Sequence, residues 1–322
     1  MLNYCLRKLG QLAVVMVLIS FFSFAVIYIA PGDISSMYLS PDMTEEEQQA
    51  VIEMLGLDKS LPEQYLGWAK EAIQGNFGNS LASKTPVWPL LTRRLPSTIL
   101  LMGVSLLVSL ALAIPLGLIA AYKKNTWVDN AVSAFAYFGM SIPSFYFGML
   151  MIILFTAKLH WLPSSGMHSV GVDTLPDTLA HMFMPVMTMA LSHMASYTRY
   201  VRANAIGQLS EEYVLAAKAK GTMPGKILSH HVLKNTLLPI ITLLGMNMAS
   251  LVCGSFIIES VFGWPGVGSF AMEAIGKRDY PVIMAYVMLS GAILVVGNFV
   301  ADILYSFADP RIKRGIDEAH GK

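Results

Sequence analysis

The sequence has little charge and almost no cysteine. Charged residues make up 13% of its 322 residues, about half the share that soluble globular domains carry. Hydrophobic residues make up 55%, and the mean hydropathy is +0.56. This composition excludes an ordinary soluble domain and predicts a protein that crosses the bilayer several times. Cys5 and Cys253 are too few and too far apart for a disulfide framework or a structural zinc site.

The sequence also lacks the motifs of nucleotide binding and hydrolysis. The run 221–227 contains glycines and a lysine, but a phosphate-binding loop needs four residues between its glycines and Ser or Thr after its lysine. Neither His-Glu-x-x-His nor Gly-x-Ser-x-Gly, the patterns of metalloproteases and serine hydrolases, occurs. We therefore predict that the chain is not an enzyme, and that a separate chain hydrolyses ATP if the function requires it.

Six apolar runs are long enough to cross a hydrocarbon core of about 30 Å as helices. They lie at residues 9–30, 98–121, 131–157, 182–200, 236–258 and 282–307. The first run follows Arg7 and Lys8 and is longer than the core of a secretory signal peptide, so we interpret it as a span. The sequence therefore predicts an all-α membrane protein with six transmembrane helices.

The distribution of basic residues predicts the orientation of these spans. Of the 22 Lys and Arg residues, 14 fall on the side that holds both termini, and five of the other eight lie in one long loop. This bias predicts that both termini are cytoplasmic. The expected parts are an N-terminal helix at 1–30, an external segment at 31–97, a five-helix core at 98–307 with a cytoplasmic loop at 203–235, and a cytoplasmic tail at 308–322.

A polar segment at 211–239 separates the fourth and fifth runs and predicts two short amphipathic helices. Gly221 is expected to end the first helix, and Pro224 to begin the second. Ser210 is a candidate N-cap of the first helix. The small residues are expected to form a face that another protein could approach closely: Ala216, Ala217 and Gly221. A helical loop lying on the membrane surface is the alternative interpretation.

A few residues in or beside the spans are candidates for a gate or pathway. Pro143 predicts a kink in the third span, for which a structural role is favoured over gating. Glu259 and Asp302 are acids of the kind that mark transport pathways, but they are too few to favour a proton-coupled carrier. For Asp302 we favour an interfacial ion pair, with three candidate partners: Arg199, Arg202 and Arg311.

Methionine and histidine gather in and beside the fourth run. They are His181, Met182, Met184, Met187, Met189, His193 and Met194. Thioether sulfur and imidazole could pass a transition metal, which makes Met187 and His193 pathway candidates and His181 and His193 candidate metal ligands. Packing is the favoured explanation, because the chain has 21 methionines and methionine fills apolar gaps readily.

Seven runs distributed over nearly the whole chain carry a resemblance. They are LAAKAKG at 215–221, the external run 56–81, SIPSF at 141–145, WLPSSG at 161–166, IIESVFGWPGVG at 257–268, RDYPVI at 278–283 and ADPRIKR at 308–314. Together they resemble the ABC-importer permeases of the dipeptide, oligopeptide and nickel transport family. The first run resembles the EAA loop of such permeases, although Leu215 stands where the general pattern has Glu, and Leu238-Pro239 falls later than usual.

The resemblance implies a type I ABC-importer permease in the bacterial cytoplasmic membrane, carrying peptides or a nickel or metal chelate. In that family the EAA loop forms coupling helices that dock on an ATPase. The residues that the resemblance assigns to this coupling loop are Leu215, Ala216, Ala217, Lys218, Gly221 and Pro224, of which Ala216, Ala217 and Gly221 match the general pattern. The implied partners are a second permease, two ATPases that bind ATP and Mg²⁺, an external binding protein and lipid; no cofactor or nucleic acid is expected on this chain. A secondary carrier working without ATPases is the alternative.

Overall fold

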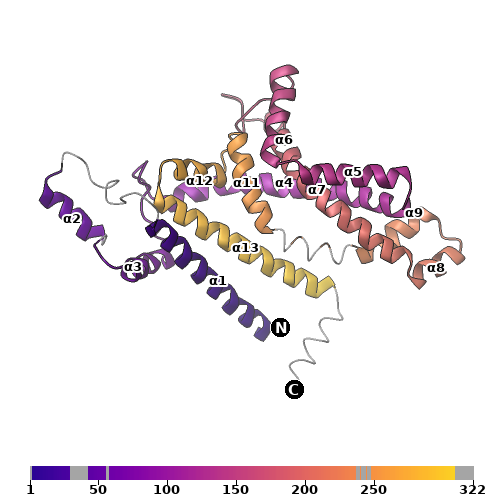
Figure 1. Cartoon of the computed structure of the whole chain (residues 1–322), viewed down its shortest axis with the longest axis horizontal. Coiled ribbons are helices and arrows are strands. Elements are labelled where there is room, and N and C mark those ends of the chain that lie inside the picture. Colours follow the sequence, from indigo (N-terminus) through magenta and orange to yellow (C-terminus); the bar gives the residue numbers. More distant parts are fainter. Residues whose placement is uncertain are drawn as a thin grey trace. The chain divides into compact units, whose positions relative to one another are not determined.

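The computed structural model describes residues 2–29, 43–55, 58–236, 240, 244 and 248–308. Regular structure within these residues is helical, apart from one isolated bridge between Asn79 and Pro86 (Figure 1). Contacts divide the chain into two compact units, which are described separately. The first is Met1–Pro96 with Gly266–Val295, and the second is Ser97–Pro265 with Val296–Lys322.

In the first unit, α1 (Leu2–Ile29) packs against α3 (Leu61–Ile73), which follows α2 (Glu45–Leu55). The hydroxyls of Ser20 and Tyr65 lie 2.9 Å apart, and the Phe21 ring meets Tyr65 edge-on. A capping box formed by Ser60 and Glu63 begins α3. Much of the apolar surface of α1 stays exposed, because no other described helix covers it; a helix with this surface belongs in lipid.

The rest of the first unit joins the start of α4 (Val87–Tyr122) to α12 (Val267–Gly276) and α13 (Tyr280–Ala308). Its core consists of Val87, Leu91, Val267, Ala274, Val282 and Ala285. Beside this core, the buried carboxylate of Asp279 accepts hydrogen bonds from Ser80 Oγ at 2.5 Å and from the backbone N–H groups of Leu81 and Ala82 at 3.0 and 3.2 Å. Asp279 therefore fastens the 80–82 turn to the start of α13.

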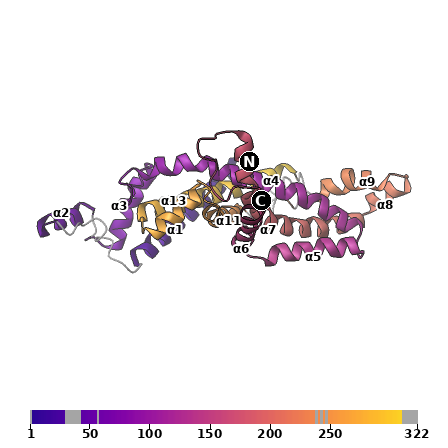
Figure 2. The same cartoon turned by 90° about the horizontal axis from the view of Figure 1, so that it is seen from above.

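The second unit is organised around α7 (Leu175–Leu209). Both views show α5 (Trp127–Ser141) running alongside α7, which also contacts α6 (Ser144–Met151) and α11 (Met248–Val261) (Figures 1 and 2). A π-helical turn, η2 (Ile152–Lys158), continues α6. Three short elements follow α7: α8 (Glu212–Ala219), α9 (Pro224–Lys226) and η3 (Ile227–Val232).

Proline breaks the third apolar run, as the sequence predicts. Ile142 adopts the extended backbone that a following proline favours, and Pro143 stands at the N-cap of α6. The helix pair Trp127–Ser141 and Ser144–Lys158 is bent by 100° at this break. The expected kink is therefore a sharp elbow between two separate helices.

Three described helices are long and apolar enough to cross a membrane: Gly10–Ile29, Val87–Tyr122 and Tyr280–Val300. The bent pair makes a fourth if it is one broken span. The fourth run of the sequence lies in α7, which is not among them, and much of the fifth, 236–258, lies outside the described residues. The six-span count therefore stays a prediction. The helix that contains the second apolar run, α4, begins at Val87, well before the expected start near residue 98.

Candidate functional site

The segment 211–232 after α7, here called the connecting segment, forms two short helical pieces. The first, α8, ends at Ala219, and Gly221 follows with a φ of +76°, a left-handed conformation that favours glycine. Pro224 then begins α9. The predictions that the first helix ends near Gly221 and that the second begins at Pro224 are therefore confirmed. The N-cap of α8 is Glu211, so the expectation that Ser210 caps it is wrong; Ser210 instead caps the C-terminus of α7.

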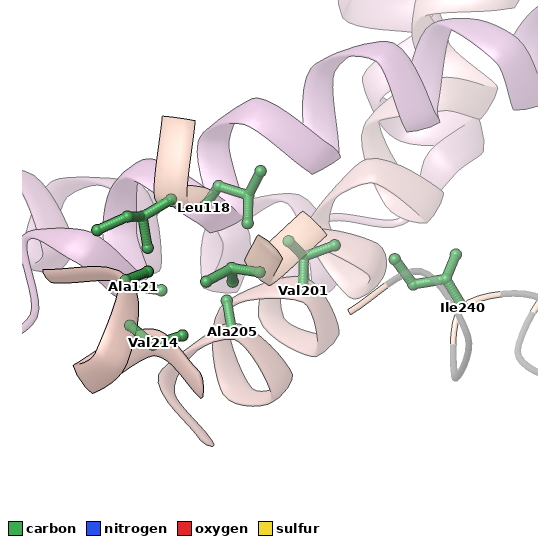
Figure 3. Close-up of a cluster of buried hydrophobic side chains, with 9 residues drawn as sticks. Leu118, Ala121, Val201, Ala205, Val214 and Ile240 are labelled. Carbon is green, nitrogen blue, oxygen red and sulfur yellow. The ribbon is translucent and has the colours of Figure 1, made fainter. Parts of the chain in front are cut away.

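One face of the connecting segment is buried against the ends of α4 and α7. Figure 3 shows Val214 near Leu118 and Ala121 of α4 and near Ala205 of α7. The whole cluster is Leu118, Ala121, Val201, Ala205, Val214, Ala217, Ile227, Val232 and Ile240. Burying a side chain the size of valine contributes about 1.5–3 kcal/mol. The connecting segment is thus firmly attached to two long helices.

The opposite face of the connecting segment is exposed, and its composition differs in part from the expectation. Ala216 and Gly221 are exposed as predicted. Lys218 and Pro224 are also exposed, and Leu215 is 55% exposed. Ala217 is only 7% exposed. It faces the protein's own core because it lies one turn after Val214 on the same side of α8.

The sequence analysis missed Met223, which is 77% exposed in the turn before α9. Leu215 and Met223 are thus the two large apolar side chains of the connecting segment that are clearly exposed. The signal was available: a large apolar residue between Gly221 and Pro224 lies in a turn, where a helical core face is not expected.

The histidine candidates lie apart on α7. His181 is buried, and its Nδ1 lies 2.9 Å from the backbone oxygen of Asp177. His193 is half-buried and stacks on Tyr197 with ring centroids 6.2 Å apart. Twelve residues of helix separate the two histidines, about 18 Å, so one metal ion cannot bind both. Among the described residues no group of three or more His, Cys, Asp or Glu is placed to hold a metal.

The remaining pathway candidates fall in different surroundings. Met187 is half-buried in α7, whereas Met182, Met184, Met189 and Met194 are buried. Glu259 is completely buried near the end of α11, and its backbone oxygen accepts the N–H of Trp264 at 2.8 Å. Asp302 belongs to α13, but its side chain lies outside the described residues, as does Arg311.

The two other expected partners of Asp302 have neighbours of their own. The Arg199 guanidinium lies 5.0 Å above the centre of the Tyr137 ring of α5. Arg202 forms an ion pair with Asp129, which the sequence analysis did not single out. Both arginines therefore attach α7 to α5.

Two runs that the sequence analysis identified only by resemblance lie together. The Gly166 N–H, at the end of the 161–166 run, donates to the Phe262 backbone oxygen at 2.9 Å. Trp264, in the 257–268 run, is completely buried, and its indole N–H donates to the Ser97 backbone oxygen at 3.0 Å. These bonds join the loop after α11 to the loop before α7 and to α4.

The described residues thus combine apolar helices of spanning length, a broken helix pair and a short helical segment attached to the ends of two long helices. The chain belongs to the family described as "Binding-protein-dependent transport system inner membrane component", whose model matches residues 113–314. The model of the family's N-terminal part matches residues 1–102. The protein is therefore a permease of the peptide group of ABC importers.

Similar proteins cover almost the whole chain. The oligopeptide transport system permease protein AppB of Bacillus subtilis is 36% identical over 315 residues, which cover 97% of this chain and 100% of that protein. The glutathione transport system permease protein GsiC of Escherichia coli K12 is 32% identical over 313 residues, covering 97% and 99%.

Similarity to a solved structure supports the fold. A chain of the MetNI methionine ABC transporter, in an inward-facing conformation, matches with a TM-score of 0.55 at 20% identity. The match covers 68% of this chain and 96% of that chain. The protein thus acts as the permease subunit of an ATP-driven importer.

Proposed function

We propose that this permease imports peptides, and that its connecting segment is the site at which a separate ATPase subunit docks. The substrate class rests on the relatives, which are named for the transport of oligopeptides, di- and tripeptides, and glutathione. Nickel or a metal chelate is the alternative cargo. Uptake of labelled peptide against uptake of nickel by the same complex distinguishes the two.

The observation that carries the docking proposal is that the connecting segment is buried on one side and exposed on the other. Val214 and Ala217 anchor it to α4 and α7, while Leu215 and Met223 leave apolar surface exposed on the other side. Exposed apolar side chains rimmed by polar residues are typical of a protein interface. Covering by an ATPase would bury this surface, and the anchored side would transmit the motion to both long helices.

The proposed assembly follows from this role. Six spans of type I architecture put both termini and the connecting segment on one side of the membrane, and the bias of basic residues favours the cytoplasmic side. A second permease completes the pathway, two ATPases bind ATP and Mg²⁺, and an external binding protein delivers the peptide. This chain performs no covalent chemistry and holds no cofactor.

The docking proposal is tested by replacing both exposed apolar side chains with charged ones. The double variant Leu215→Glu with Met223→Glu is expected to lose co-purification with the ATPase subunits and ATP-dependent uptake. Ile73→Glu in α3 is the matched control, because that side chain is 87% exposed and lies outside the connecting segment. A double variant that binds its ATPases and transports as the control does would refute the docking site.

Gly221 provides a second test of the same site. A leucine there has space, since nothing lies within 4 Å of the added Cβ, but it must adopt the left-handed backbone, which costs roughly 1–2 kcal/mol. We expect Gly221→Leu to distort the turn and uncouple transport. Gly225→Leu is the control, because that position has equal space without the positive φ. Normal substrate-stimulated ATP hydrolysis and uptake in Gly221→Leu would contradict the proposal.

The secondary-carrier alternative and the orientation have their own tests. The purified chain alone in liposomes is expected to accumulate no peptide; accumulation without ATPases would support the alternative. Lys218 and Lys220 are expected to resist membrane-impermeant amine labels added outside intact cells. Labelling from outside would place the connecting segment on the wrong side for an ATPase.

A further inference from the structure

An ion pair with a buried carboxylate joins the start of α5 to the end of α7. Asp129 is 2% exposed and accepts hydrogen bonds from Arg202 Nε at 2.5 Å and Nη2 at 2.7 Å. The Asn125 backbone N–H donates to the same carboxylate at 2.9 Å. Two parallel bonds between a guanidinium and a carboxylate fix both the separation and the relative rotation of the helices that carry them.

Arg202 lies in the part of α7 to which the connecting segment is anchored. Its chain neighbour Val201 and nearby Ala205 are completely buried in the cluster that holds Val214 of α8. Gly117 of α4 comes so close to the same part of α7 that an added Cβ would lie 2.6 Å from Val201. The end of α7 is therefore held by α4, α5 and α8 together.

A second contact fixes the far end of α5 to α7. A Cβ added at Gly139 would lie 3.1 Å from the Ala195 Cβ and 3.3 Å from the Leu191 backbone oxygen. Ten residues of helix separate Gly139 from Asp129, about 15 Å. An element held at two such points cannot pivot on its neighbour, so α5 moves with α7.

The 100° elbow lies just beyond this second contact and leads to α6. Gly148 of α6 packs against Phe262, which follows α11, and against Thr188 of α7, with an added Cβ 3.1 and 3.4 Å away. A continuous series of packed groups thus runs from α8 through the ion pair and α5 to the elbow.

We propose that Asp129 and Arg202 are positioning residues that transmit movement of the connecting segment to the elbow between α5 and α6. This inference rests on the proposed docking of an ATPase on that segment. Apolar contacts allow small sliding movements, whereas the two-pronged ion pair keeps its register. Replacing a buried ion pair with well-packed apolar groups of similar volume is often neutral for stability, so fixing the geometry is the role that the ion pair adds.

The test measures peptide uptake per ATP hydrolysed by the complete complex in vesicles. Asp129→Asn and Arg202→Gln are each expected to lower this ratio about tenfold, the size of a typical coupling energy. Arg202→Gln also leaves the buried Asp129 carboxylate unpaired, so the melting temperature of that variant should fall. The double variant leaves no unpaired charge; its melting temperature should recover while the ratio stays low. Lys124→Gln is the control, since it removes an exposed charge from the neighbouring loop.

The double variant decides between transmission and simple stabilisation. If its ratio returns to the wild-type value together with its melting temperature, the ion pair only stabilises the fold and the proposal is overturned. Single variants with the wild-type ratio would overturn it as well. In either case the docking proposal is unaffected, provided that the wild-type complex still couples peptide uptake to ATP hydrolysis. A wild-type complex without ATP-driven uptake contradicts the proposed function first, and this inference with it.

Discussion

Replacing Gly117 with alanine should separate α4 from α7. The added Cβ would lie 2.6 Å from both Cβ and Cγ1 of Val201 and 2.8 Å from the Thr198 backbone oxygen. Ordinary contacts of this kind begin near 3.4 Å. The oxygen belongs to the backbone and cannot rotate away, so the helices themselves must shift. Overpacking of this kind costs about 1–3 kcal/mol.

The matched control lies on the same helix. A Cβ at Gly103 would meet nothing within 4 Å, so Gly103→Ala adds the same methyl group without a clash. Both changes gain the helix propensity of alanine, about 1 kcal/mol in water, and their difference isolates the clash. Thermal unfolding of both variants in one detergent should give a lower melting temperature for Gly117→Ala, by roughly 2–4 °C per kcal/mol on the scale of soluble domains. If the melting temperature of Gly117→Ala equals or exceeds that of Gly103→Ala, the close approach of α4 and α7 is refuted.

Three further predictions follow from single contacts. Asp279→Asn should loosen the turn at Ser80, whose hydroxyl and neighbouring N–H groups bind the carboxylate, and speed proteolysis there relative to wild type. The pKa of Asp177 lies below its usual range because the Ser169 hydroxyl and backbone N–H donate to its carboxylate. Its contribution to loop stability is therefore present above about pH 4 and lost as the pH falls through the lowered pKa; acid-induced proteolysis of the loop should lose this step in Asp177→Asn. Trp264→Phe removes the indole hydrogen bond to α4 and should cost about 1 kcal/mol, which an unchanged melting temperature would contradict.

Local rules predicted the breaks in the helices well. Pro143 and Pro224 lack a backbone donor, and Gly221 adopts a backbone that other residues avoid, so each position limits the local structure whatever surrounds it. The apolar runs were equally readable, because the length of helix needed in a bilayer is fixed. The elbow at Pro143 exceeded the expected kink, since its angle depends on what α6 packs against.

Tertiary contacts explain where prediction from the sequence was wrong or incomplete. The charged residues Arg93 and Arg94 made the start of α4 look like a loop, but Arg94 lies 4.2 Å from the centre of the Phe270 ring and donates to the Leu90 backbone oxygen at 3.0 Å. Ala217 could not be assigned to a face, because α8 has only 8 residues and too few apolar positions to define one. The pairing of charges on α5 and α7 joins residues far apart in the chain, which spacing cannot reveal.

The hydrogen bonds around Trp264 are accepted by main-chain oxygens, which affects the substitutions that this protein tolerates. Every residue type supplies a carbonyl, so the accepting positions Ser97 and Phe262 can be exchanged without losing the bond. An indole N–H, by contrast, has no equivalent among the other side chains. A saturation library should therefore accept many residues at 97 and few at 264, so that the burden of holding these loops together falls on one amino acid.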